Sequence, residues 1–325
     1  MKKLFLLIAL LSMMSAGAAA GLNAETIKMK LNQAEALLDD NSPEKAIKIL
    51  DEVLKERPQD ERAFYLKGQA LSRQENFDNA IKSYDRALSI NPDYSQAMAG
   101  RCEALVATKK CREGQNCCGD LVKMDPESET YRLIAGNALK NPACFKPVAG
   151  DERYESEYYL DAIAYYDGAL LLNNNSTSAR NNKGVALGEL GTTMGDTGKV
   201  NESLACFDAA LKINTSFAEA WNNKGVTLDR WGEWENDHLL SSTAETRHQE
   251  ALKCYDLALA VNSNLSEAMF NKAETLGLNE SAFESAQEYY KKAVKINPRL
   301  RGKIGWIYIE IVPEMPSQIP GDNSG

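Results

Sequence analysis

The sequence predicts an all-α protein built from stacked pairs of amphipathic helices. Apolar side chains recur at helical spacing through most of the 325 residues. Small residues return at a fixed place in the helices, where two backbones must approach closely, and a proline closes several of the units. Such units bury their apolar faces against their neighbours, so a long chain can form one array without domain breaks.

The stretch from Glu61 to Tyr94 shows this pattern most clearly. Its apolar face consists of Phe64, Gly68 and Leu71 in a first helix and of Phe77, Ala80, Ile81, Tyr84 and Ala87 in a second. Pro92 closes the unit. The stretch resembles a tetratricopeptide repeat, except that Lys67 stands where the family has leucine. The resemblance implies a right-handed superhelical solenoid whose concave groove is lined by the first helices.

Seven such repeats account for residues 27–300. We place them at 27–60, 61–94, 95–128, 129–176, 177–217, 218–265 and 266–300. The third repeat carries Gly114 where most of the others have alanine, which predicts a weak second helix because glycine costs about 1 kcal/mol there. Apolar residues at helical spacing predict a capping helix over 301–312, and the proline-containing segment 313–325 is expected to be a flexible tail.

Three repeats contain insertions between their two helices. Ala80 follows Gly68 by 12 residues, whereas the corresponding separations are 26, 19 and 26 residues in the fourth, fifth and sixth repeats. The insertions therefore fall along one edge of the expected solenoid, which is often the binding side of repeat proteins. In the sixth repeat, Ser242 and Glu245 have the spacing of a capping box, which predicts that the insertion lengthens the second helix.

The first 20 residues have the features of a signal peptide. Two lysines precede an apolar run, and Ala18-Ala19-Ala20 fits the cleavage rule. The alternative is an uncleaved membrane anchor, because residues 4–20 reach the short limit for a spanning helix. We expect an exported protein that is extracellular, periplasmic or at the cell surface. A net charge of −9 argues against nucleic acid as the main partner.

Asparagines mark a candidate peptide site. Asn182, Asn223 and Asn271 occupy the same place in three successive first helices. An amide side chain can donate to and accept from one peptide unit, so this row could hold an extended peptide by its backbone. Similar ladders occur in long tetratricopeptide superhelices that bind peptides. The alternative is that each asparagine bonds to the adjacent repeat.

Aromatic residues of the insertions are a second candidate contact surface. Trp231 and Trp234 belong to the sixth repeat, and Tyr154 and Tyr158 to the fourth. Tryptophan and tyrosine are enriched at binding hot spots. The alternative is that these rings pack the lengthened helices together.

Five of the seven cysteines lie between residues 102 and 144, which favours disulfides outside the cytoplasm. We expect Cys102 to face Cys118 within the third repeat, and either Cys111 or Cys117 to reach Cys144. Zinc is the weaker alternative because the segment lacks paired CxxC spacing and histidine.

The N-x-S/T sequons allow glycosylation, and they begin at Asn174, Asn175, Asn201, Asn214, Asn264 and Asn279.

A row of lysines precedes the small-residue position in several first helices. The row consists of Lys67, Lys183, Lys224 and Lys272. We expect their stems to cover apolar surface and their ammonium groups to pair with local carboxylates.

No catalytic residues, cofactor or metal site are expected. Both histidines, His238 and His248, lie in one insertion without a nucleophile motif nearby. We therefore expect an exported scaffold that binds a partner protein or peptide through the groove and the inserted edge, with membrane contact only through an uncleaved leader. The alternatives are a self-associating structural protein of the cell surface and an accessory subunit of an enzyme complex; the sequence leaves the oligomeric state open.

Overall fold

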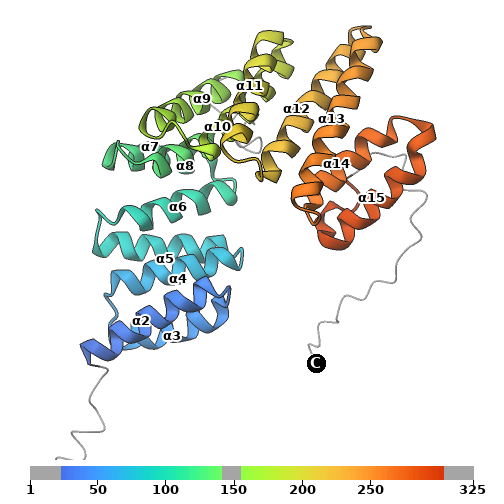
Figure 1. Ribbon diagram of the computed structural model, residues 1–325. Helices are drawn as coiled ribbons and strands as arrows, with labels where there is room; N and C mark the ends of the chain where they lie inside the picture. Colours follow the sequence, from blue (N-terminus) through green and yellow to red (C-terminus); the bar gives the residue numbers. More distant parts are fainter. Residues whose placement is uncertain (1–22, 141–154, 304–325) are drawn as a thin grey trace, which may run out of the picture. The chain divides into compact units, whose positions relative to one another are not determined.

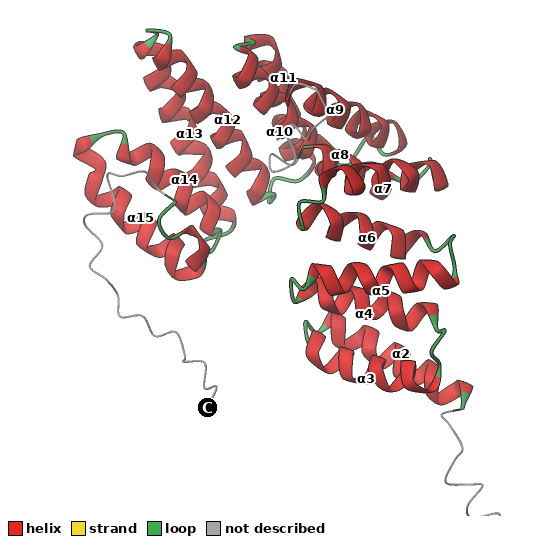
Figure 2. Ribbon diagram, turned by 180° about the vertical axis from the view of Figure 1, so that it is seen from behind, coloured by secondary structure: helices red, strands yellow, loops and turns green. Residues whose placement is uncertain are grey.

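The computed structural model describes residues 23–140 and 155–303 (Figure 1). Within these ranges the backbone forms fourteen α-helices, two short 3-10 helices and no strand (Figure 2). The expected all-α repeat solenoid is therefore confirmed. The helices group into two compact units, Met1–Arg153 and Tyr154–Gly325. No helix of the described ranges has the length and apolar character needed to cross a membrane.

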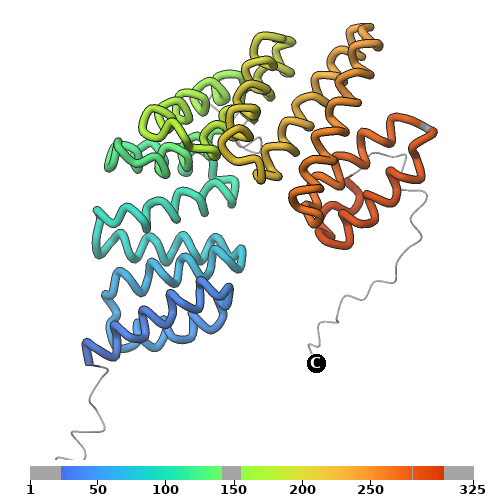
Figure 3. Tube along the Cα trace, viewed as in Figure 1, coloured from blue at the N-terminus to red at the C-terminus, as the bar shows by residue number. Residues whose placement is uncertain are grey.

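The first unit contains helices α2 to α8, which follow one another as antiparallel neighbours (Figure 3). Their bounds are α2 Ala24–Asp39, α3 Pro43–Glu56, α4 Glu61–Arg73, α5 Phe77–Ile90, α6 Ser95–Ala107, α7 Cys111–Met124 and α8 Glu129–Leu139. Each helix packs on the next, and the first helices α2, α4, α6 and α8 also pack on one another in sequence. Helices α4, α6 and α8 begin at the first residues of the second, third and fourth expected repeats.

The second unit contains helices α9 to α15. Their bounds are α9 Glu155–Leu172, α10 Thr177–Met194, α11 Thr197–Ile213, α12 Ala218–Asp237, α13 Ser241–Val261, α14 Ser266–Gly277 and α15 Phe283–Ile296, with 3-10 helices η2 Glu280–Ala282 and η3 Pro298–Leu300. Here too each helix packs on the next, and α12 packs on both α10 and α14. The two helices of the fourth expected repeat, α8 and α9, thus belong to different units.

Small residues of the first helices allow a large ring from the second helix to fill each pair. A Cβ added at Gly68 would lie 2.5 Å from the ring of Tyr84, and one added at Gly225 would lie 2.6 Å from that of Tyr255. Both rings are almost fully buried. Glycine at these positions therefore leaves the room that the ring needs, as the sequence pattern predicts.

Side-chain caps set the start of several helices. Asn23, Asp60, Ser128, Ser176 and Asp196 each accept a hydrogen bond from a backbone N–H in the first turn of the helix that follows. Such caps satisfy donors that the helix itself cannot, and each typically contributes about 1 kcal/mol.

The insertion of the sixth repeat lengthens both helices of its pair. Helices α12 and α13 have 20 and 21 residues, whereas α4 and α5 have 13 and 14. The predicted capping box is wrong: α13 begins at Ser241 after Leu240, so Ser242 already lies inside the helix. The chain reverses through Leu239, which has a φ of 63°. Helix α13 therefore begins two residues earlier than a cap at Ser242 predicts, since its N-cap is Leu240.

Two further expectations concern the third repeat and the C-terminal end. Helix α7 is continuous from Cys111 to Met124, and a Cβ at Gly114 would lie 2.8 Å from Cγ2 of Val106. Glycine there permits close contact with α6, and the predicted weakness of the helix, which concerns its stability, stays a prediction. At the C-terminal end, η3 packs Leu300 onto the core of the last pair. Residues 304–312 of the predicted cap and the tail lie outside the described residues.

Candidate functional site

The asparagine row lies on α10, α12 and α14 and is linked by hydrogen bonds between helices. Asn223 Nδ2 donates to Oδ1 of Asn181 over 3.0 Å, and Asn271 Nδ2 donates to Oδ1 of Asn222 over 2.9 Å. Asn181 also donates to Oδ1 of Asn182 over 3.1 Å. Asn181 and Asn222, which accept these bonds, were not among the predicted site residues. Each is the first residue of an Asn-Asn doublet that is visible in the sequence.

These bonds join adjacent repeats, as the alternative interpretation of the asparagine row predicted. They do not use all the hydrogen-bonding groups of the asparagine side chains. An asparagine has two N–H donors and two acceptor lone pairs. Asn223 donates one bond to Asn181 and accepts one from Asn222, over 3.3 Å. One donor and one acceptor site of Asn223 therefore remain, and its side chain is half-buried.

The predicted pairing of the lysine row is confirmed. Each lysine bonds to an aspartate 16 residues earlier, on the second helix of the preceding pair, and Arg101 does the same. The pairs are Lys67–Asp51, Arg101–Asp85, Lys183–Asp167, Lys224–Asp208 and Lys272–Asp256. Exposed pairs of this kind contribute between about 0 and 1 kcal/mol each. Their constant spacing fixes the contact between consecutive repeats.

The aromatic residues of the inserted edge mainly pack. Trp231 is 3% exposed and Tyr158 5% exposed, so neither can be the proposed surface contact. Trp234 is half-buried and stacks between Trp231, at 4.6 Å between ring centroids, and His238, at 3.9 Å. A Cβ at Gly195, which ends α10 with a φ of 66°, would lie 2.7 Å from the Trp234 ring. Tyr154 lies outside the described residues.

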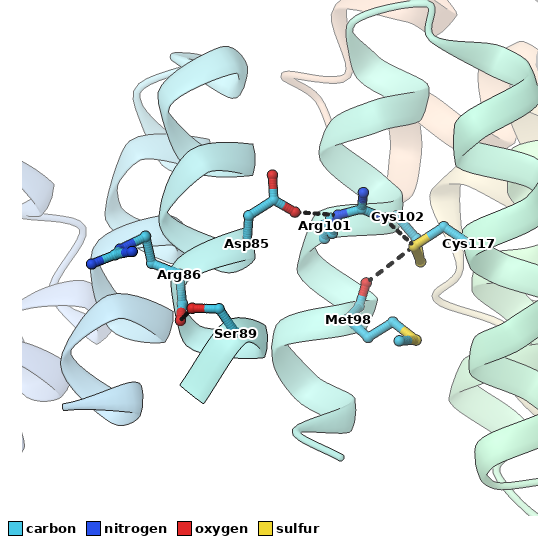
Figure 4. Close-up of polar contacts among 7 residues, drawn as sticks. All are labelled: Asp85, Arg86, Ser89, Met98, Arg101, Cys102 and Cys117. Carbon is cyan, nitrogen blue, oxygen red and sulfur yellow. Dashed lines mark hydrogen bonds and ion pairs between the residues drawn. A yellow bond between two sulfur atoms is a disulfide. The ribbon is translucent and has the colours of Figure 1, made fainter. Parts of the chain in front are cut away.

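The disulfide of the third repeat joins Cys102 to Cys117, with the two Cα atoms 5.4 Å apart (Figure 4). The predicted pairing of Cys102 with Cys118 is therefore wrong. Cys118 is a free, buried thiol, and burial raises its pKa to about 12. Cys117 and Cys118 are adjacent and buried on α7, and spacing alone does not distinguish neighbours on one helix. Cys111 is also disulfide-bonded, and Cys144 lies outside the described residues.

The disulfide adjoins the contact with the second repeat. A guanidinium N–H of Arg101 lies 3.5 Å from Sγ of Cys117, and Nε of Arg101 donates to Asp85 over 2.6 Å (Figure 4). Arg101 thus connects α5, α6 and the disulfide. The disulfide holds α6 to α7, and the ion pair holds α6 to α5. Together they hold the two helices of the third repeat to each other and to the second repeat.

A polar network on α12, α13 and α14 was not predicted. Asp229 accepts from Nδ1 of His248 over 2.6 Å and from the hydroxyl of Thr275 over 2.5 Å. The hydrogen bond to Asp229 raises the pKa of His248. Burial, with the neighbouring Glu233, raises the pKa of Glu274 to about 7. The threonine bonds to the aspartate and not to the imidazole, so the network is not a nucleophile–base arrangement.

The part of the chain that the structure describes offers no set of metal ligands. No group of three or more His, Cys, Asp or Glu side chains there could hold a metal ion.

The sequence profile of the tetratricopeptide repeat matches residues 31–95 and 266–300. A search of curated proteins by sequence found no match. The matched ranges cover most of the first repeat, the second and the last, none of which is among the three repeats with insertions.

Solved structures of repeat proteins resemble the chain across most of its length. A tetratricopeptide repeat protein from Parabacteroides merdae is 14% identical, with a TM-score of 0.61, over 84% of this chain and 94% of its own. A thermophilic repeat protein of Thermus thermophilus is 16% identical, with a TM-score of 0.50, over 67% and 99%. The APC/C hetero-tetramer Cut9-Hcn1 is 12% identical, with a TM-score of 0.56, over 86% and 47%. At these identities the likeness shows the fold alone.

Proposed function

Because the chain is a tetratricopeptide repeat protein with the fold of a protein-interaction scaffold, we propose that it binds an extended peptide segment along α10, α12 and α14. The observation that carries the proposal is the row formed by Asn182, Asn223 and Asn271. The three residues repeat at one helix position, and the bonds to Asn181 and Asn222 fix the orientation of their amides.

The hydrogen-bonding capacity that remains at Asn223 matches a peptide unit. A peptide unit offers one N–H and one C=O, and Asn223 retains one acceptor and one donor site. Recognition through the backbone selects an extended conformation and depends little on the partner's side chains. The proposed role of the chain is therefore binding.

A selection with random heptapeptides tests this proposal. Peptides selected on the full chain are measured by fluorescence anisotropy against the wild type and a variant with Asn182, Asn223 and Asn271 all changed to Ala. We expect at least tenfold weaker binding to this variant, because several hydrogen bonds worth about 1 kcal/mol each are lost. Asn201→Ala is the matched control, since Asn201 is exposed on the second helix α11.

Peptides with a methylated backbone provide a second test of the proposal. Replacing a peptide N–H by N–CH3 removes one donor without changing any side chain, so binding to the wild type should weaken at alternate positions. Equal binding by the triple variant and the wild type would contradict the proposal, as would peptides that tolerate methylation at every position.

The proposal includes export. The features of residues 1–20 support a cleaved leader, and a disulfide between Cys102 and Cys117 fits an oxidising compartment. The intact mass of the protein recovered from its producing cells tests this. A mass that still includes the first 20 residues would favour the membrane-anchored alternative.

A further inference from the structure

A second candidate site lies on the first unit, whereas the asparagine row belongs to the second unit. It is a pocket of about 370 Å3 between α4, α5, α6 and α8. The side chains that define it are those of Phe77, Tyr84, Glu103, Val106, Ile134 and Asn137, together with the backbone at Gly100. Most of this lining is apolar, and Glu103 is its acidic member.

The pocket arises where the asparagine row is absent. Gly100 and Ile134 stand at the repeat position that Asn182, Asn223 and Asn271 occupy in the second unit. A Cβ at Gly100 would lie 2.5 Å from the ring of Tyr84, so the ring rests directly on the backbone of α6. Ring and glycine together make the floor of the pocket.

Glu103 is the unusual member of the lining. No donor or cation of the described residues reaches its carboxylate. Its side chain is exposed by accessible area, yet burial raises the pKa of the carboxyl, which is what a charge inside a concave surface experiences. The basic residue nearest to it in the sequence, Arg101, forms an ion pair with Asp85. A carboxylate in a concave, mostly apolar lining, with no counter-ion among the described residues, is stabilised by a cation that enters.

We propose that this pocket receives a basic side chain, lysine or arginine, from a protein partner. The aliphatic stem would lie against Tyr84 and Ile134, and the cationic head would pair with Glu103. A purely apolar side chain would bury the carboxylate without compensation, and an acidic one would be repelled. This inference rests on the proposed scaffold function, but it uses none of the asparagines.

Synthetic peptides on the full chain test the pocket. Acetylated, amidated hexapeptides of the form Gly-Gly-X-Leu-Gly-Gly carry X as lysine, arginine, norleucine or glutamate and are measured by fluorescence anisotropy. We expect the basic peptides to bind the wild type at least fivefold more tightly than the norleucine peptide. Glu103→Gln keeps the shape of the side chain and should remove this preference, a loss of about tenfold for a charge-assisted bond.

Two further variants separate charge from folding. Glu127→Gln removes an exposed carboxylate in the turn between α7 and α8 and should change nothing. Glu103→Lys should reverse the preference, so that the glutamate peptide binds most tightly. A preference for basic peptides that survives in Glu103→Gln would overturn the proposal, and so would a wild type that does not distinguish lysine from norleucine.

The asparagine variant distinguishes the two proposals. Basic-peptide binding that persists when Asn182, Asn223 and Asn271 are alanine, but depends on Glu103, supports the pocket alone. Binding that requires the asparagines and ignores Glu103 refutes the pocket and leaves the asparagine row standing. If the protein itself dimerises in sedimentation experiments and Glu103→Gln abolishes the dimer, the occupant is a second copy and the partner proposal is wrong.

Discussion

Removing the disulfide between Cys102 and Cys117 should strongly destabilise the first unit. The bond closes a loop with a sequence separation of 15 residues between α6 and α7. By chain entropy, a loop of this length stabilises the folded state by about 3 kcal/mol. For a unit of this size, that free energy corresponds to a fall in melting temperature of about 10 °C.

Alanine variants measured by thermal unfolding in circular dichroism test this value. Cys117→Ala should lower the free energy of unfolding by the full amount of about 3 kcal/mol. Cys102→Ala should lower it equally, because both substitutions remove the same disulfide. Cys118→Ala is the matched control: it removes a neighbouring buried sulfur but no cross-link, so it should lose only about 1 kcal/mol of packing.

The control decides between the two pairings. Cys117 and Cys118 are adjacent and share one tryptic peptide, so substitution separates them more simply than peptide mapping. A larger loss in Cys118→Ala than in Cys117→Ala would refute the pairing described here. Equal small losses in all three variants would show that the disulfide contributes no stability.

Three other predictions follow from packing and charge. Gly225→Ala should destabilise the second unit by a few kcal/mol, because its Cβ would overlap the ring of Tyr255, and a urea titration measures this. Gly119→Ala should stabilise α7 by about 1 kcal/mol in the same assay, because no described atom lies within 4 Å of the added Cβ. The pKa values of Glu274, about 7, and His248 are both raised, so the folded unit holds more protons than the unfolded chain near pH 6. Stability should therefore fall as the pH rises from 5 to 8, and Glu274→Gln should flatten this profile in melting experiments.

The sequence predicted the helix pairs well because their packing repeats locally. Glycine opposite an aromatic ring recurs at Gly68 with Tyr84 and at Gly225 with Tyr255, and each contact involves residues close in the chain. The alternation of small and large residues therefore predicts how the two helices of a pair pack. The lysine pairing was predicted for the same reason, since a row of identical charges at one position needs a row of partners.

The contact surfaces were harder to predict because they depend on how far each helix extends. The lengthening of α12 places Trp231 in the interior, where it stacks on Trp234, although a tryptophan in an insertion suggests a surface. The choice between Cys117 and Cys118 depends on a rotation of about 100° along one helix, which spacing does not fix. Glu103 has no sequence signal at all, because its character comes from the concave surface around it.

The insertions leave the stacking of consecutive repeats unchanged, and the basic–acidic pairs show why. The separation between partners is 16 residues for Lys67–Asp51, where no insertion occurs, and also for Lys224–Asp208, which lies between two repeats with insertions. The insertions add residues between the helices of one pair, whereas the ion pairs span the turn from one pair to the next. The inserted residues therefore lengthen the helices only at the ends that face the turn within a pair. A repeat protein can gain surface at those ends without disturbing the face on which Asn223 and its neighbours are aligned.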